Sequence, residues 1–105
     1  MGRIKLRQWN TAEHLQSPED IAAYLEACFE EAGDDPAFIA EALGVVARSK
    51  GMSQLARATG LTREGLYKAL SSEGNPSFAT ILKVVKALGL RIGLEPADDG
   101  RPAAA

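Results

Sequence analysis

Apolar residues recur every three or four positions along most of residues 18–88, a pattern typical of amphipathic helices. In the first such stretch the predicted buried positions are Ile21, Tyr24, Leu25, Cys28 and Phe29. Ser17 is expected to cap this helix, and Pro18 suits its first helical position. Asp20 follows three residues after the cap, and Gly33 ends the periodic pattern. Cys28 is therefore interpreted as a core residue.

Two more helices are predicted by similar signals. One begins at an Asp35 cap followed by Pro36 and ends at Gly51, with the buried stripe Phe38, Ile39, Ala42, Leu43 and Val46. Arg48 and Lys50 fall in its last turn, where the helix dipole favours cations. The other follows a Ser77 cap and ends at Gly89, with the stripe Phe78, Ile81, Leu82, Val85 and Leu88.

Between these helices, residues 52–72 predict two short helices joined by a tight turn. The first would carry Leu55, Ala56 and Ala58, and the second Leu66, Tyr67, Ala69 and Leu70. Gly60 supplies positive φ where the first helix ends, and Ala56, four residues earlier, lets the second helix cross close by. This arrangement favours a helix-turn-helix.

The two ends of the chain read differently from the helical part. Residues 3–9 alternate charged and apolar side chains, as an edge strand would, and residues 90–94 alternate again. The second strand could pair with the first or with its own copy in a second subunit. We therefore predict an N-terminal arm over residues 1–16, an all-α domain over residues 17–95 and a flexible tail over residues 96–105.

The charge of the chain is divided between two blocks. Residues 10–47 contain nine acidic side chains and no Lys or Arg, whereas residues 48–91 contain eight basic side chains and two acidic ones. A chain of net charge −2 therefore combines a block of −9 with a block of +6. The asymmetry indicates two faces with different partners, one of them polyanionic, although solvated acidic helices would give the same pattern.

Length and composition narrow the class of protein. A chain of 105 residues is expected to form one domain, and no apolar run approaches the roughly 20 residues of a membrane span. We see no secretory signal, so a cytoplasmic protein is expected. The single cysteine excludes an internal disulfide, and His14, the one histidine, is expected to be exposed and without a role. No P-loop or dinucleotide glycine motif is present, so we predict neither an enzyme nor a cofactor or metal site.

Residues 52–89 resemble the phage-repressor type of helix-turn-helix domain. The resemblance rests on Ala56, Gly60 and Leu66, and on the later Gly74-Asn75-Pro76-Ser77 followed by a helix ending Ala-Leu-Gly. It implies a five-helix, lambda-repressor-like bundle. In relatives, a polar cap and a glutamine often stand three or four residues before the Leu-Ala pair. Here Ser53 and Gln54 directly precede Leu55 and Ala56, so Gln54 is a weak candidate for a phosphate contact.

A longer resemblance covers nearly residues 7–95. Trp9-Asn10, the helix start Ser-Pro-Glu, the string Asp-Pro-Ala-Phe-Ile-Ala-Glu-Ala-Leu-Gly and the string Gly-Leu-Tyr-Lys-Ala-Leu are similar to those of addiction-module antidote proteins. These are small HigA-like antitoxins, encoded beside a toxin of the RelE/HigB type. The resemblance implies an antitoxin that binds its operator as a homodimer, represses its own transcription and neutralises the toxin.

The same resemblance places the helix from about Arg63 to Ser71 in the major groove of DNA. Arg63 is the first candidate for reading a base, because a guanidinium can bond O6 and N7 of guanine together. Tyr67 and Lys68 share the outward region, whereas Leu66, Ala69 and Leu70 should face the core. The complete set of expected DNA-binding residues is Arg57, Thr62, Arg63, Glu64, Tyr67, Lys68, Ser71, Asn75 and Ser77.

Several of these residues have a second explanation. Thr62 should cap the helix and could also meet a phosphate. Ser77 could be a phosphate contact, a plain N-cap, or both. Glu64 could accept from cytosine, or it could repel phosphates at wrong registers. Gly65 costs about 1 kcal/mol in a helix relative to alanine, which a close approach to DNA or to the preceding helix would explain.

The acidic block suggests a surface for the toxin. A basic RNA-cleaving toxin would be attracted to Glu26, Glu30 and Glu31, and Trp9 is a further candidate. Two alternatives remain open: a phage-type repressor without a toxin partner, and a protein-interaction module that no longer binds DNA.

Overall fold

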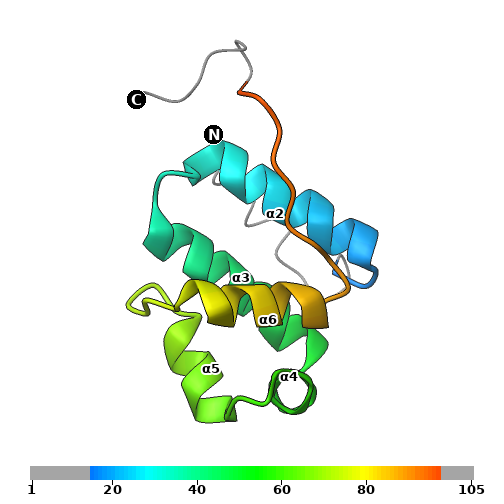
Figure 1. Ribbon diagram of the computed structural model, residues 1–105, viewed down its shortest axis with the longest axis vertical. Coiled ribbons are helices and arrows are strands. Elements are labelled where there is room, and N and C mark those ends of the chain that lie inside the picture. Colours follow the sequence, from blue (N-terminus) through cyan, green and yellow to red (C-terminus); the bar gives the residue numbers. More distant parts are fainter. Residues whose placement is uncertain (1–14, 98–105) are drawn as a thin grey trace.

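The computed structural model describes residues 15–97, which form five α-helices and no strand (Figure 1). The helices are α2 (Pro18–Ala32), α3 (Pro36–Lys50), α4 (Met52–Thr59), α5 (Arg63–Ala69) and α6 (Phe78–Ala87). The predicted all-α class is therefore confirmed for this part of the chain. None of these helices is long and apolar enough to cross a membrane. The predicted strand at residues 3–9, Trp9 and His14 lie outside the described residues.

The predicted helix starts are confirmed by their side-chain caps. The Asp20 amide donates to Ser17 Oγ at 3.1 Å, and the Asp20 carboxylate accepts from the Ser17 amide, which makes a capping box. The Asp35 carboxylate accepts from two amides in the first turn of α3, those of Ala37 and Phe38. Each cap satisfies amides that have no partner inside the helix, so each helix begins at a defined residue.

The helices stack so that α2, which is acidic, lies far from α4 and α5, which carry Arg57, Arg63 and Lys68. Helix α2 packs on α3, α3 also contacts α4 and α5, and α6 packs on α4. Figure 1 shows α2 at one end of the molecule and the α4–α5 pair at the other, with α3 and α6 between them. The acidic side chains of α2 and the basic side chains of α4 and α5 therefore lie at opposite ends of the helical stack.

One hydrophobic core holds this stack together. Helices α2, α3, α5 and α6 all contribute to its largest fully buried side chains, and one more comes from the residue directly after α5. These side chains are Ile21, Cys28, Val46, Leu66, Leu70 and Val84. Helix α4 adds Met52 and Leu55, each 4% exposed. The core position predicted for Cys28 is confirmed. Leu15, ahead of α2, is also buried and was not predicted.

Three of the predicted core positions are wrong. Phe29, Phe78 and Leu82 are exposed at 55%, 67% and 44% respectively. The predicted positions Val85, inside α6, and Leu88, directly after it, are buried, and α6 also buries Val84, which was not predicted. An amphipathic stripe has two edges, and the pattern of residues alone does not say which edge the neighbouring helix covers.

The strand predicted at residues 90–94 does not form. Leu90 still packs on the core and donates its amide to the Val85 carbonyl at 3.0 Å, but residues 91–97 have no regular structure. A strand needs a hydrogen-bonded neighbour, and no described residue provides one. Pairing with a second subunit stays a prediction.

Candidate nucleic-acid interface

Helices α4 and α5 are joined by the three residues Gly60, Leu61 and Thr62. Gly60 ends α4 in the left-handed conformation (φ 76°), as predicted, and its amide donates to the Ala56 carbonyl at 2.9 Å. Helix α4 begins at Met52, directly after Gly51. The turn is fixed inside as well, because the buried Thr59 hydroxyl donates to the Leu55 carbonyl at 2.9 Å. The direction in which α5 leaves the turn is therefore well defined.

Thr62 caps α5, as predicted, because its Oγ1 accepts from the Gly65 amide at 2.9 Å. This contact also gives a physical reason for glycine at position 65. A Cβ there would lie 2.9 Å from the capping Thr62 Oγ1 and would meet no other described residue within 4 Å outside its own helix. The suggested close approach to the preceding helix is therefore wrong, and the group nearest to such a Cβ is the helix's own cap.

Helix α5 divides into a buried side and an exposed side. Leu66 and Leu70 are fully buried and anchor the helix, and Ala69 is partly buried, as predicted. The side chains of Arg63, Glu64, Tyr67 and Lys68 are all exposed. The helix itself ends at Ala69, two residues before the predicted boundary, because Leu70 turns away from helical geometry at φ −99° and ψ 50°.

Arg63 and Tyr67 contact each other on the exposed side of α5. The Arg63 Cζ atom lies 5.8 Å from the centroid of the Tyr67 ring, within the range of a cation–π interaction. No hydrogen bond or ion pair joins the Arg63 guanidinium to another described residue. The sequence placed both residues on the outward side but gave no sign that they touch.

The loop after α5 folds back onto the end of that helix. The Ser71 hydroxyl donates to the Lys68 carbonyl, and the Gly74 amide donates to the Ser71 carbonyl, both at 2.9 Å. Gly74 then passes directly over the backbone carbonyls of Lys68 and Ala69, where any Cβ would collide with them. Only glycine therefore allows this close return.

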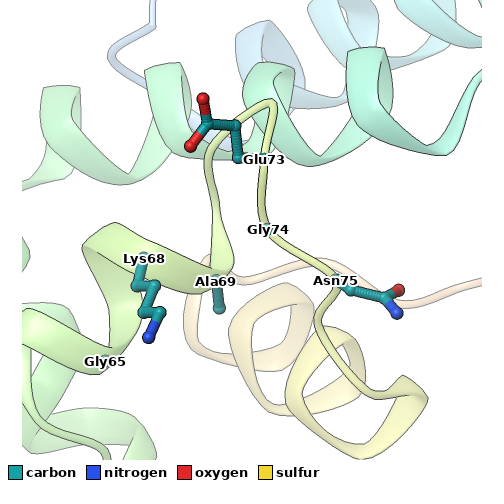
Figure 2. Close-up of a pocket in the computed structure, with 6 residues that line it drawn as sticks. All are labelled: Gly65, Lys68, Ala69, Glu73, Gly74 and Asn75. Atoms are coloured by element: carbon teal, nitrogen blue, oxygen red, sulfur yellow. The ribbon is translucent and has the colours of Figure 1, made fainter.

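The fold of this loop leaves a shallow hollow beside α5, with a volume of about 270 Å³ (Figure 2). It is lined by Gly65, Lys68, Ala69, Glu73, Gly74 and Asn75. Figure 2 shows the Glu73 carboxylate pointing away from the Lys68 ammonium group, on the far side of the loop. Lys68 and Asn75 thus share one small concave surface, and the carboxylate does not cover the lysine.

The remaining predicted DNA-binding residues lie on the neighbouring elements. Ser77 caps α6, because its Oγ accepts from the Thr80 amide at 3.1 Å. Arg57 is exposed in the last turn of α4. Within residues 15–97, no Lys or Arg forms an ion pair with an Asp or Glu. The basic side chains around α5 are therefore not held in ion pairs with carboxylates of the described residues.

The predicted toxin-binding glutamates lie on α2. Glu26, Glu30 and Glu31 are all exposed, and Glu26 and Glu30 are one helical turn apart on the same side. Phe29 is exposed next to them, which sequence reasoning missed because its spacing also fits the buried stripe. This end of the molecule therefore combines carboxylates with an accessible aromatic ring.

Behind this surface, α2 has an apolar inner side. Burial raises the pKa of Cys28 above its ordinary value. Burial also raises the pKa of Tyr24, and the neighbouring Cys28 raises it further. Both side chains are therefore neutral in the folded protein at neutral pH. In the part of the chain that the structure describes, no three His, Cys, Asp or Glu side chains gather where they could hold a metal ion.

Comparison with known proteins gives two matches. The family model described as "Probable addiction module antidote protein" matches residues 5–96. An uncharacterized protein of Haemophilus influenzae is 50% identical over 91 residues, which cover 87% of this chain and 92% of that relative. No solved structure matches. Both matches span all five described helices.

Proposed function

Because the chain belongs to the family of probable addiction module antidote proteins, we propose that it is the antitoxin of a type II toxin–antitoxin module. The match over residues 5–96 is the observation that carries this proposal. An antidote implies a toxin partner of some kind. A RelE/HigB-like toxin is the specific partner that we propose, and the protein would neutralise it by binding rather than by catalysis.

We place the toxin contact on the exposed side of α2. Glu26 and Glu30 present two carboxylates there, and Phe29 offers an aromatic ring of the kind enriched in protein interfaces. An RNA-cleaving toxin is expected to be basic, because it binds a polyanion. Charge complementarity would then speed the encounter, and the ring would contribute buried contact area.

A pull-down with the product of the neighbouring gene tests this contact. The double variant Glu26→Lys, Glu30→Lys should lose most of the captured toxin, because it replaces attraction with repulsion. Glu73→Lys is the control, since it changes an exposed carboxylate in the loop between α5 and α6, outside α2. Equal capture by the double variant and the control would rule out this side of α2.

We further propose that the protein binds operator DNA and represses its own transcription, with α5 in the major groove. The support is the exposed side of α5, where Arg63 and Lys68 have no ion-pair partner among the described residues. Arg57, Thr62, Ser71, Asn75 and Ser77 surround it and would contact the backbone. A homodimer would present two such helices to half-sites about one helical turn, roughly 34 Å, apart.

A gel shift on the promoter of the protein's own operon, repeated at several salt concentrations, tests DNA binding. Arg63→Ala should relax the preference at one base pair, at a cost of about 1–3 kcal/mol. Lys68→Ala should weaken binding to all sequences about equally and lower the salt dependence. If the wild-type protein shows no shift, the protein-interaction module without DNA binding replaces this proposal.

The phage-type repressor without a toxin partner is the second candidate. It is supported by the same α4–turn–α5 unit and differs only in having no partner for α2. Inspection of the adjacent reading frame separates the two, because a module of this kind places the toxin gene beside the antitoxin gene. Either function would be exercised in the cytoplasm, where the operon is transcribed.

A further inference from the structure

The contact between Arg63 and Tyr67 follows from helix geometry. The two residues are four positions apart on α5, so they lie one turn apart on the same side of the helix. Side chains in a helix lean toward its N-terminus, which brings the Tyr67 ring over the turn that carries Arg63. The Arg63 Cζ atom is held 5.8 Å from the ring centroid by this arrangement.

This contact leaves the hydrogen-bonding groups of Arg63 available. A cation–π interaction acts through the charge of the guanidinium and uses none of its five N–H donors. Glu64, the adjacent acidic residue, does not compete for these donors, since neighbours in sequence point to different sides of a helix. No other described residue hydrogen-bonds or ion-pairs with the guanidinium. The Arg63 side chain is thus restrained in direction, while its N–H donors are not engaged by other described residues.

We propose that Tyr67 is a positioning residue, whose ring orients the Arg63 guanidinium for bidentate recognition of guanine. A free arginine loses much side-chain freedom when it is fixed against a base, and a ring that already restricts it lowers this loss. Tyr67 thereby contributes to base preference without itself reading the base. The inference rests on the proposed DNA-binding function of α5.

Two substitutions separate the ring from the hydroxyl. Tyr67→Phe keeps the aromatic ring and removes the hydroxyl, which a direct contact with DNA would need. Tyr67→Leu removes the ring and keeps an apolar side chain with good helix propensity. Tyr67 is 41% exposed and outside the core, so both variants should fold. Circular dichroism and thermal unfolding of each variant check this.

The experiment first selects the preferred duplex of the wild-type full chain from a random library. The guanine that Arg63 reads is then the one whose replacement no longer matters in Arg63→Ala. Tyr67→Leu should reduce the preference for that guanine about threefold, as expected for an exposed cation–π contact. Tyr67→Phe should keep the preference. In the Arg63→Ala background, Tyr67→Leu should cause no further loss.

Each contrary result has a separate meaning. An equal loss in Tyr67→Phe and Tyr67→Leu would show that the hydroxyl contacts DNA, and it would overturn the positioning role. Tyr67→Leu would overturn it too if it left the preference intact, or if it caused the same loss without Arg63. A wild-type protein that binds no DNA would overturn the proposed function together with the role of Tyr67, before any Tyr67 variant is compared.

Discussion

Helices α2 and α5 both begin at a hydroxyl cap and bury one side, but they differ in length and in charge. Helix α2 has 15 residues and buries four of its own side chains, whereas α5 has seven residues and buries only Leu66 within its bounds. The exposed side of α2 carries carboxylates, and that of α5 carries Arg63 and Lys68. The two proposed contact surfaces are therefore built on supports of very different strength.

The difference shows how a short helix can still present side chains accurately. A seven-residue helix is far below the length at which an isolated helix is stable in water. Helix α5 therefore depends on its cap, on the turn at Gly60 and on two buried leucines, Leu66 and Leu70. Helix α2, by contrast, is stabilised by buried side chains distributed over about four turns. Equivalent changes should accordingly harm α5 more than α2.

The largest expected effect is that of Leu66→Ala, which removes the main anchor of α5. Leu66 is fully buried, so the substitution should lower the free energy of unfolding by about 3 kcal/mol through lost burial and a new cavity. Urea unfolding followed by circular dichroism measures the loss. Leu82→Ala is the matched control, because Leu82 is 44% exposed and should cost less than about 1 kcal/mol. Equal losses would contradict the anchoring role of Leu66.

Removal of the two caps compares the helices directly. Thr62→Ala and Ser17→Ala should each cost about 1 kcal/mol of unfolding free energy. Only Thr62→Ala should also weaken the proposed DNA binding, because the first turn of α5 carries Arg63. Both quantities can be measured on the same preparations by urea unfolding and gel shift. If Ser17→Ala weakened DNA binding as much, the two ends of the molecule would not be independent.

Alkaline pH should act on the α2 side of the core. The folded state raises the pKa values of Cys28 and Tyr24 above their ordinary values of 9.0 and 10.0, so the folded protein holds protons that the unfolded chain releases. This contribution to stability is therefore present below about pH 9 and is lost progressively as the pH rises above it. Urea unfolding at several pH values measures this slope, and Tyr24→Phe should flatten it above pH 10. A slope of opposite sign would show that the two groups ionise more readily in the folded protein than in the unfolded chain.

Much of this fold could be predicted from the sequence, because local chemistry decides where helices begin and end. The caps at Ser17, Asp35, Thr62 and Ser77 act within three residues, and the positive φ at Gly60 needs no distant partner. The division of α5 into buried and exposed sides was expected from the resemblance to helix-turn-helix domains. These features depend on neighbours along the chain, which a sequence displays directly.

The features that were missed depend on neighbours in space. Phe29, Phe78 and Leu82 fit a buried stripe, and only the packing of α3 and α4 decides that they stay exposed. The contact between Arg63 and Tyr67 depends on the rotamers of two exposed side chains. The absent strand at residues 90–94 depended on a partner strand that the described residues do not contain.

The smallest expected effect on stability is that of Phe29→Ala on α2. Its ring is 55% exposed, so the substitution should change the free energy of unfolding by less than about 1 kcal/mol, whereas Leu25→Ala in the same helix should cost about 2 kcal/mol or more. If Phe29 belongs to the toxin contact, the same variant should capture clearly less toxin while it unfolds at nearly the wild-type urea concentration. A Phe29→Ala protein that is as unstable as Leu25→Ala would instead show that Phe29 contributes to the core. The comparison of α2 with α5 would then depend on the remaining residues. Unchanged stability with unchanged capture would remove the ring from the contact and leave only the carboxylates of α2.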